Sequence, residues 1–384
     1  MSELEILDRL IAFDTVSRTS NLELVGYVRD YLAGLGVGAT VLPNEDGSKA
    51  SLFATIGPTD RPGLLLSGHS DVVPVDGQSW TRPPFRLTRE DGRVYGRGTT
   101  DMKGFVACAL ALVPRLAADD LALPVHLALS HDEEIGCFGA HAIASHLREI
   151  GLRPLAAFVG EPTGMAVVNG HKGSCGLLTE VQGLSCHSSR PDQGVNAIFH
   201  ALDLVGFLRA RAEALEAAPD PGSPFDPPYT SVSVGVIQGG TARNAIPGDC
   251  RFQWDIRGTR PGMIEAIRGE LDAFGEREIL PRMRERFQEA AITTSIVYDA
   301  PPLVAEPAGA AEALAARFSG NDATETMAYG SEAGIFQRED ISTVICGPGD
   351  IRQAHTEDEW IEVAQLEACS RFMHRLADHA TNPA

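Results

Sequence analysis

Acidic and histidine side chains follow several short apolar runs in this sequence. The segment LLLSGHSD ends in His69 and Asp71, and the segment LALSHDEEIG places Glu133 and Glu134 directly after another apolar run. Residues two apart in an extended chain point to the same side, so His69 and Asp71 should share one side just beyond a strand. Such a pair can form the start of a metal site.

Three later segments add side chains of the same types. GRGTTDMKG places Asp101 in a glycine-rich turn, VGEPT places Glu161 after an apolar run, and QAHTEDEW adds His355 in a late loop. Ligand sites of open α/β sheets lie beyond the carboxyl ends of the strands, so these side chains should converge. Histidines and carboxylates without thiolates suit Zn²⁺, Co²⁺ or Mn²⁺, and a carboxylate can bridge two ions. The set predicts a two-metal hydrolytic site.

Glu133 and Glu134 are expected to have different roles, because adjacent side chains in an extended segment diverge. One can bind metal while the other accepts a proton from water and passes it to a leaving amine. Asp71 is open to two interpretations, since it could take part in the chemistry or hold the other ring nitrogen of His69 and fix its tautomer. Cys137 could suggest a nucleophile, but a packed thiol is the better interpretation of a cysteine without an assignable histidine.

A single Asp or Glu after a strand is most often a helix cap or a solvated loop residue. The site hypothesis therefore depends on the whole ordered set of segments. It also requires an architecture that brings the ends of several strands together.

Apolar periodicity supplies that architecture. It predicts helices over 4–13 and 22–35, strands over 37–42, 52–56 and 63–67, and a helix and strand alternation up to about residue 173. Half-exposed strands then mix with helices over 195–217 and 262–274, which indicates a small α+β domain inserted into the first. After a return linker we expect a helix over 310–318, the strand STVICG and a final helix from Asp358. The predicted domains are 1–174 with 302–384, and an insertion over 175–301.

Composition excludes several classes of protein. The 384 residues contain 32 Lys and Arg against 52 Asp and Glu, and the net charge of −20 argues against nucleic-acid and anionic-membrane partners. No stretch approaches the apolar length of a membrane span, and the start lacks the features of a signal peptide, so we expect a cytoplasmic protein. Seven cysteines without a Cys-x-x-Cys pair indicate reduced thiols.

The segments SGHSDVVP, GRGTTDMKG, HDEEIG, GEPT and QAHTEDEW resemble, in this order, the motifs of the dinuclear zinc aminoacylase and carboxypeptidase family. The resemblance covers nearly the whole chain. It implies an α/β fold class, with a mixed-sheet metallohydrolase catalytic domain and an inserted α+β lid or dimerisation domain. The cofactors it implies are two Zn²⁺ per chain, with Co²⁺ or Mn²⁺ as substitutes. The implied ligands are His69, Asp101 and Glu161 for one ion and Asp101, Glu134 and His355 for the other.

The same resemblance assigns roles to other residues. Asp71 matches the catalytic aspartate and Glu133 the general base, and relatives have a cis peptide where Met102 follows Asp101. In the inserted segment, CHSSRPDQGVNAI places His187 where the family's lid histidine reaches into the partner subunit's site and binds the carbonyl oxygen of the scissile amide. An exposed histidine without this role is the alternative. The resemblance thus implies a homodimer formed through the lid domain.

Substrate contacts and the reaction are also implied. Asn244 and Arg257 match positions that hold the substrate's carboxylate, although a salt-bridged surface role remains open for Arg257, and Ser331 stands where relatives have threonine. The segments NGHKG, YGSEAG and GPGDIRQAHTEDEW resemble most the branch that deacetylates an N-acetylated amino acid in arginine biosynthesis. A desuccinylase or another N-acyl-amino-acid amidohydrolase is the alternative. A binding protein on the same scaffold should have lost a ligand or the base, and none is missing.

Overall fold

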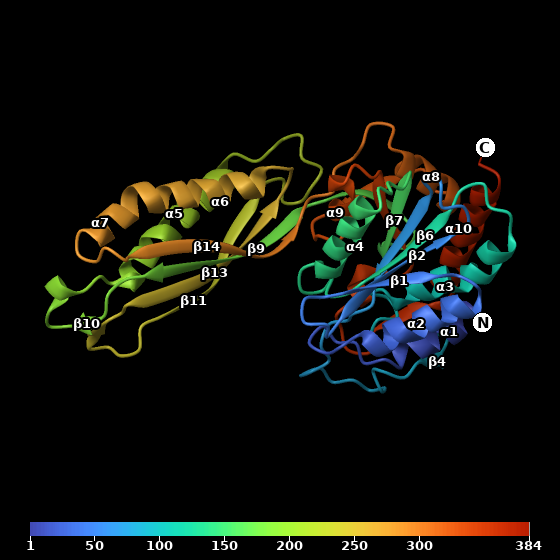
Figure 1. Cartoon of the computed structure of the whole chain (residues 1–384), viewed down its shortest axis with the longest axis horizontal. Helices are drawn as coiled ribbons and strands as arrows, with labels where there is room; N and C mark the ends of the chain where they lie inside the picture. The colour runs from blue at the N-terminus through green and yellow to red at the C-terminus, as the bar shows by residue number, and fades with distance from the viewer. Residues whose placement is uncertain (384) are drawn as a thin grey trace. The chain divides into compact units, whose positions relative to one another are not determined.

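The computed structural model describes residues 1–383, which divide into two compact units (Figure 1). Unit 1 comprises Met1–Gly170, Leu303–Thr326 and the segment from Ser331 onward, whereas unit 2 comprises His171–Pro302 and Met327–Gly330. The chain therefore leaves unit 1 after Gly170, forms most of unit 2, and returns at Leu303 to complete unit 1, with one further short segment in unit 2. Each unit is described separately below.

Unit 1 is built on an eight-stranded mixed sheet. In spatial order its strands are β1 (Ala39–Pro43), β2 (Ala50–Ile56), β6 (Val125–Ser130), β3 (Leu64–His69), β7 (Ala156–Pro162), β16 (Thr343–Gly347), β8 (Val167–His171) and β15 (Thr324–Met327). The four strands β6, β3, β7 and β16 run parallel. On one side β2 pairs antiparallel with β6 and β1 antiparallel with β2, and on the other side β8 pairs antiparallel with β16. This mixed sheet with helices confirms the predicted α/β fold class.

Helices cover both faces of this sheet (Figure 1). They are α1 (Glu3–Ile11), α2 (Leu22–Gly34), α3 (Lys103–Ala118), α4 (Phe138–Glu149), α8 (Ala310–Ser319), α9 (Ala333–Arg338) and α10 (Val363–Thr381), with the short turn η3 (Ile351–Gln353). Leu64 and Leu66 of β3 pack into the core that α1, α2, α3, α8 and α10 share, whereas buried Leu65 between them lies outside that core. This alternation is the two-residue period of a strand that is buried on both faces.

The start of the final helix differs from its prediction. Trp360–Glu362 forms a strand, β17, whose residue Trp360 pairs with Tyr95 of β5 (Arg93–Tyr95), and β4 (Thr88–Glu90) completes this small sheet. Asp358 has a φ of 52°, which a helix does not accommodate. The helix therefore begins at Val363 and not at Asp358.

Unit 2 is an antiparallel sheet with helices packed on one face (Figure 1). Its four strands, in spatial order, are β11 (Ser231–Gly239), β13 (Asp249–Gly258), β9 (Gly173–Gln182) and β14 (Ala291–Ala300). The remaining elements are β10 (Cys186–His187), β12 (Ala245–Ile246), η1 (Pro191–Gln193), α5 (Ala197–Ala217), α6 (Met263–Phe274), η2 (Gly275–Ile279) and α7 (Leu280–Arg284). Phe252, Trp254 and Ile256 of β13 are buried beneath the helices, while Gln253 between them is exposed.

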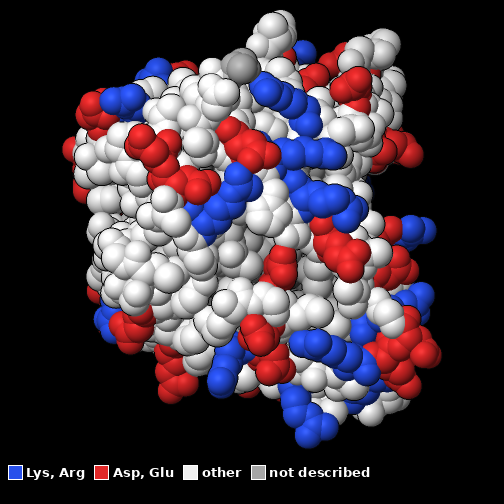
Figure 2. All heavy atoms as spheres, turned by 90° about the vertical axis from the view of Figure 1, so that its right-hand side faces the viewer, with Lys and Arg blue, Asp and Glu red and all other residues white. Residues whose placement is uncertain are grey.

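Charges of both signs are distributed over the surface. Figure 2 shows basic and acidic side chains interspersed on one face of the molecule. Near the end of α3, for example, Arg115 pairs with both Asp119 and Asp378. Among residues 1–383, no helix combines the length and the apolar character needed to cross a membrane.

Candidate metal centre

Neighbouring parallel strands bring the acidic and histidine side chains of unit 1 together. His69 is the last residue of β3, Glu133 and Glu134 follow β6, and Glu161 lies near the end of β7. Because β6, β3 and β7 are parallel neighbours, their carboxyl ends meet at one edge of the sheet. Asp101 joins them from the turn that precedes α3.

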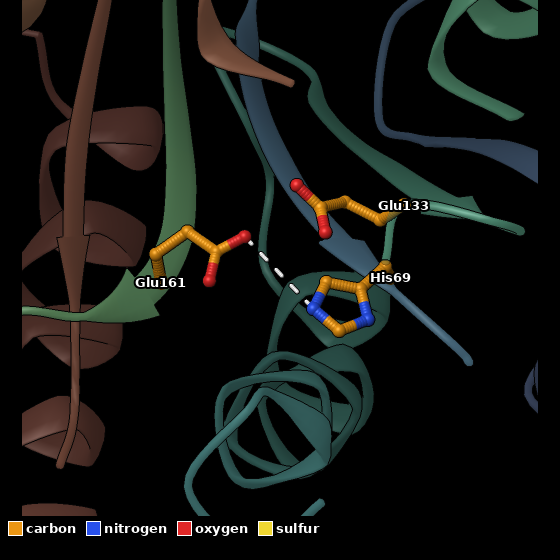
Figure 3. Close-up of side chains that lie close together, drawn as sticks. All are labelled: His69, Glu133 and Glu161. Carbon is orange, nitrogen blue, oxygen red and sulfur yellow. Dashed lines mark ion pairs between the residues drawn. The ribbon is translucent and has the colours of Figure 1, made fainter. Parts of the chain in front are cut away.

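His69 lies at the centre of this cluster and is fully buried. Its Nε2 is 2.9 Å from Asp101 Oδ1 and 3.9 Å from Glu161 Oε1. Figure 3 shows the side chains of His69, Glu133 and Glu161 directed toward one another. The other ring nitrogen, Nδ1, lies 2.8 Å from the backbone carbonyl of Asp71. A proton on Nδ1 would donate to this carbonyl, which leaves Nε2 free to bind a cation.

Asp101 lies between two histidines. While its Oδ1 faces His69, its Oδ2 is 3.2 Å from Nε2 of His355, and that same nitrogen is 3.0 Å from Glu134 Oε2. The peptide bond between Asp101 and Met102 is cis, which confirms that prediction. A carboxylate with one oxygen toward each histidine has the arrangement that a bridging ligand requires.

The donor set fits divalent cations. Two groups of side chains each place three ligand atoms within 4.8 Å of one another: His69, Glu133 and Glu161, and His69, Asp101 and Glu134. Within the cluster, the buried atoms Glu134 Oε1 and Glu161 Oε1 have no hydrogen-bond partner. Buried carboxylate oxygens are costly unless something positive satisfies them, and cations would do so here. Glu133 falls in the first group, so geometry alone does not separate the predicted base from the ligands.

The pKa values of the cluster reflect burial and crowding. Burial, reinforced by neighbouring carboxylates, raises the pKa of Glu133 to about 8 and that of Glu134 to about 7. For Asp101, burial opposes ionisation, but its hydrogen bonds to His355 and His69 hold its pKa below the ordinary value. Hydrogen bonds to Asp101 and Glu134 in turn raise the pKa of His355 to about 10. The carboxyl groups outnumber the positive partners, which is the electrostatic condition that added cations relieve.

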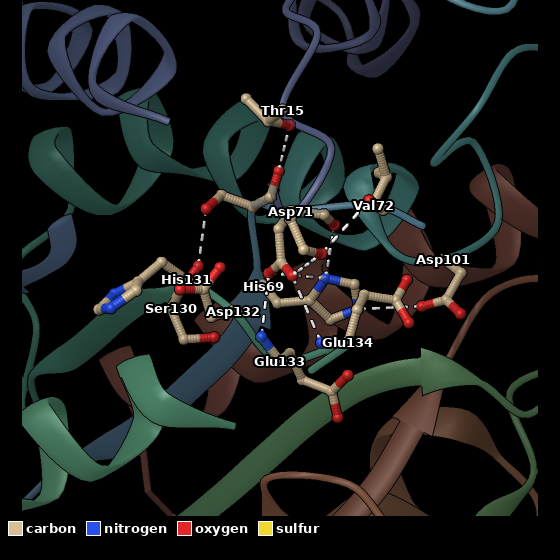
Figure 4. Close-up of polar contacts among 12 residues, drawn as sticks. Thr15, His69, Asp71, Val72, Asp101, Ser130, His131, Asp132, Glu133 and Glu134 are labelled. Atoms are coloured by element: carbon tan, nitrogen blue, oxygen red, sulfur yellow. Dashed lines mark hydrogen bonds and ion pairs between the residues drawn. The ribbon is translucent and has the colours of Figure 1, made fainter. Parts of the chain in front are cut away.

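Asp71 supports the segment that carries the two glutamates. Its Oδ1 accepts the backbone N–H of Glu133 at 3.1 Å and its Oδ2 accepts that of Glu134 at 3.3 Å (Figure 4). Ser17 Oγ also donates to Oδ2, at 2.7 Å. The carboxylate lies 3.7 Å from His69 Nδ1, so the backbone of Asp71 rather than its side chain makes the closer contact with that ring.

Two buried glutamates near the centre were missed in the sequence. Glu332, fully buried before α9, accepts the hydroxyls of Ser67 and Ser130, each at 2.6 Å. Glu359, equally buried, accepts backbone N–H groups of the turn that holds Asp101. YGSEAG contains Glu332 and HTEDEW contains Glu359, but nothing in the sequence distinguishes these two glutamates from surface carboxylates.

Ser331, predicted to bind substrate, is buried. Its hydroxyl accepts the backbone N–H of Ala333 at 3.1 Å, within the turn that starts α9. The substrate role of Ser331 stays a prediction.

The predicted catalytic histidine His187 and the other predicted substrate-binding residues belong to unit 2. His187 is exposed, and its Nδ1 lies 2.8 Å from Ser189 Oγ. The pairing of β10 with β12 sets His187 opposite Ala245, so exposed Asn244 lies beside it. The structure thus brings His187 and Asn244 together within unit 2, and their roles in the reaction stay predictions.

Arg257, on β13, is engaged in an ion pair. Its Nε donates to Asp255 Oδ1 at 2.9 Å, and both side chains are partly exposed. A substrate carboxylate would have to compete with Asp255 for this guanidinium. The predicted carboxylate contact of Arg257 stays a prediction.

Comparison with known proteins identifies the class. Residues 65–379 match the model of peptidase family M20/M25/M40. The chain belongs to this family of hydrolases, which confirms the resemblance seen in its motifs. It is 37% identical to the acetylornithine deacetylase of Myxococcus xanthus over 387 aligned positions, which cover 97% of this chain and 96% of that protein.

Solved structures share the fold at low sequence identity. The aminopeptidase PepT of Bacillus cereus superposes with a TM-score of 0.70 at 16% identity, over 99% of this chain and 98% of that one. The metallo-carboxypeptidase Sso-CP2 of Sulfolobus solfataricus gives 0.69 at 18% identity, with 98% of each chain covered. The YXEP protein of Bacillus subtilis, described as a dinuclear metal binding peptidase, gives 0.63 at 17% identity, over 98% of this chain and 96% of that one.

Proposed function

We propose that the protein hydrolyses N2-acetyl-L-ornithine to L-ornithine and acetate, as a metal-dependent amidohydrolase of arginine biosynthesis in the cytoplasm. The observation that carries this proposal is the identity of 37% over 97% of the chain to an acetylornithine deacetylase. The buried cluster of histidines and carboxylates at the carboxyl ends of the strands supports it, because its donor set suits the cations that such hydrolysis needs.

The proposed cofactors are two Zn²⁺ per chain, for which Co²⁺ or Mn²⁺ could substitute in the same donor set. His69, Asp101 and Glu161 would hold one ion, and Asp101, Glu134 and His355 the other. When bound, such ions polarise a carbonyl group and lower the pKa of a coordinated water. The buried atoms Glu134 Oε1 and Glu161 Oε1, which have no hydrogen-bond partner, support these assignments.

Glu133 is the proposed general base. It would take a proton from the attacking water as the new C–O bond forms, and deliver that proton to the nitrogen as the amide C–N bond breaks. A base works best when its pKa lies near the operating pH; burial raises the pKa of Glu133 to about 8 in the metal-free cluster, and bound cations would lower it from there. Asp71 would keep this base in place through the backbone N–H groups it accepts.

Unit 2 is the proposed lid and dimerisation domain. His187 would donate a hydrogen bond to the carbonyl oxygen of the scissile amide in the partner's site, while Asn244 and Arg257 would hold the substrate carboxylate. A second copy of this chain is proposed to pack against the exposed apolar residues of unit 2. Exposed Phe199 and Leu202 on α5, and Val236 and Ile237 on the edge strand β11, support an interface between copies.

A substrate panel with metal analysis tests the proposal. Metal-loaded protein is assayed on N2-acetyl-L-ornithine, N-acetyl-L-citrulline and N-succinyl-diaminopimelate, before and after chelation, with Glu133→Gln protein as the control for contaminating activity. We expect the highest kcat/KM on N2-acetyl-L-ornithine, loss of activity on chelation and recovery with Zn²⁺ or Co²⁺. Preference for the succinylated substrate would replace the proposal with a desuccinylase, and hydrolysis that survives chelation would overturn the metal-dependent mechanism.

A further inference from the structure

A buried ion pair lies beside the metal centre without taking part in the proposed reaction. Arg97 and Glu359 are 1% and 0% exposed, and Arg97 Nη1 is 2.7 Å from Glu359 Oε2. Removing two charges from water costs free energy, and this cost offsets much of what their attraction contributes. A buried ion pair is therefore weak evidence of a purely stabilising role. The remaining partners of the two side chains indicate a different role.

Glu359 holds the turn that presents Asp101. Its Oε2 accepts the backbone N–H of Gly98 at 2.9 Å, and its Oε1 accepts those of Thr100 at 2.9 Å and Asp101 at 3.2 Å. Next to it, Thr100 Oγ1 donates to the carbonyl of Trp360 at 2.6 Å. Three N–H groups on one carboxylate fix the backbone of this turn to the segment that follows His355.

Arg97 extends the same network to His355 itself. Its Nη2 donates to Gln78 Oε1 at 2.5 Å, and Gln78 Nε2 donates to the backbone carbonyl of His355 at 2.9 Å. Trp80 Nε1 also donates to Gln78 Oε1, at 2.8 Å, and holds that amide in this orientation. Arg97 and Glu359 therefore connect the two segments that carry Asp101 and His355.

We propose that the Arg97–Glu359 pair sets the spacing between Asp101 and His355, and so preorganises the cation site that these two residues share. Both are positioning residues, since they pair with each other and reach the ligand-bearing segments through backbone groups and Gln78, without touching the proposed cation site. The proposal rests on the metal centre of the proposed function but not on the identity of the substrate. Groups that orient metal ligands typically change metal affinity by about 10- to 100-fold when they are removed.

Metal binding to Glu359→Gln tests this role. Glutamine keeps the volume of the side chain but loses the charge, and its amide group would face backbone N–H donors. The matched control is Glu362→Gln at the end of β17, the strand that follows Glu359; Glu362 is exposed, and its carboxylate lies 3.9 Å from Arg93 Nη2. Zn²⁺ affinity is measured by competition with a chromophoric chelator, and the melting temperature of each protein is recorded with and without metal.

We expect Glu359→Gln to weaken the more weakly held Zn²⁺ by at least about 10-fold and to reduce the rise in melting temperature that metal produces. Glu362→Gln should match the unmodified protein in both measurements. A role confined to folding predicts equal falls in melting temperature with and without metal, at unchanged Zn²⁺ affinity, and that result would overturn the proposal.

A second variant covers the case in which Glu359→Gln fails to fold. Gln78→Ala removes the link from Arg97 to His355, together with the acceptor of Trp80 Nε1, at a partly exposed side chain, and leaves the buried ion pair intact. We expect a weaker second Zn²⁺ site and a smaller rise in melting temperature on adding metal, whatever the metal-free melting temperature of the variant, and unchanged affinity would contradict the proposal. Normal Zn²⁺ binding without hydrolysis of any acyl amino acid would instead count against the proposed function alone.

Discussion

The backbone N–H of Glu133 donates to the side chain of Asp71, with 3.1 Å between the nitrogen and Oδ1. Asp71, two residues beyond the end of β3, thus fixes the segment that follows β6. Ser17, which precedes α2, donates its hydroxyl to the same carboxylate at 2.7 Å. The position of the proposed base therefore depends on three segments that are distant in sequence.

Asp71→Asn should lower turnover by about 10- to 100-fold, because one acceptor oxygen becomes an N–H₂ group that opposes the backbone N–H donors. The control is Asp76→Asn, whose carboxylate is 63% exposed and pairs with Arg18 at the surface. Steady-state kinetics on N2-acetyl-L-ornithine give kcat and KM for both variants. Equal kcat values for Asp71→Asn and the control would show that this carboxylate does not position the base.

Glu133→Gln should keep both metals and lose about 10²- to 10⁴-fold in kcat, because glutamine cannot accept the proton of the attacking water. Metal content is measured by mass spectrometry on dialysed protein, alongside kcat. Glu149→Gln, at the exposed end of α4, is the control. If Glu133→Gln lost one metal per chain, Glu133 would be a ligand rather than the base.

His126 should make metal-free protein less stable as pH falls from about 6.5 to about 4. Burial lowers the pKa of this histidine from 6.5 to about 4 in the folded state. Between these values the unfolded chain binds more protons, so the free energy of unfolding decreases by up to about 1.4 kcal/mol per pH unit. The contribution of neutral His126 to the free energy of unfolding is complete above pH 6.5 and is lost as pH approaches 4.

The measurement is urea denaturation at several pH values, for the unmodified chain and for His126→Gln. Glutamine does not titrate but can still bond to Thr55, whose Oγ1 is 3.0 Å from His126 Nδ1. The variant should lose less stability on acidification, with a total difference of up to about 3 kcal/mol. Parallel curves for the two proteins would mean that His126 does not contribute to the acid sensitivity.

Glu332→Ala should lower the free energy of unfolding by about 1–3 kcal/mol, because the buried hydroxyls of Ser67 and Ser130 lose their shared acceptor. Urea denaturation of metal-free protein measures this loss without contributions from cations. Glu339→Ala, which removes a partly buried carboxylate whose partner Arg148 is exposed, should cost less, about 1 kcal/mol. A loss at Glu332 as small as that at Glu339 would contradict the prediction.

Complementation between two inactive variants tests the proposed action of His187 across a dimer. A mixture of His187→Ala and Glu133→Gln chains should recover up to about a quarter of the unmodified activity, because half of the dimers are mixed and each has one intact site. Subunit exchange is verified independently with two differently tagged chains. Activity no higher than the background of each variant, with exchange complete, would remove the trans role.

The clustering of the candidate metal ligands was predictable because these residues follow strands that are recognisable from their apolar runs. His69 ends β3, Glu133 follows β6, and Glu161 lies near the end of β7. Because the carboxyl ends of neighbouring parallel strands lie at one edge of the sheet, these side chains were expected to lie together. The local pattern also located most helices, for example 310–318 against the observed Ala310–Ser319. Periodicity within one segment sufficed for these elements.

The buried supports could not be predicted in this way. The serines that Glu332 binds are 265 and 202 residues away in sequence, and Glu359 meets the Asp101 turn across 258 residues. Whether a glutamate is solvated or buried depends on what packs against it, which a single sequence does not record. The late start of α10 has the same origin, because β17 forms only by pairing with distant β5.

The order of the proposed ligands along the chain has a consequence for biosynthesis. His69, Asp101, Glu134 and Glu161 all precede Gly170, where the chain leaves unit 1, whereas His355 follows its return at Leu303. A nascent chain emerging from the ribosome must therefore make the whole of unit 2 before the last ligand exists. Until then the proposed site that requires His355 stays incomplete, so binding of a second ion there would mark the moment at which the two halves of unit 1 have joined.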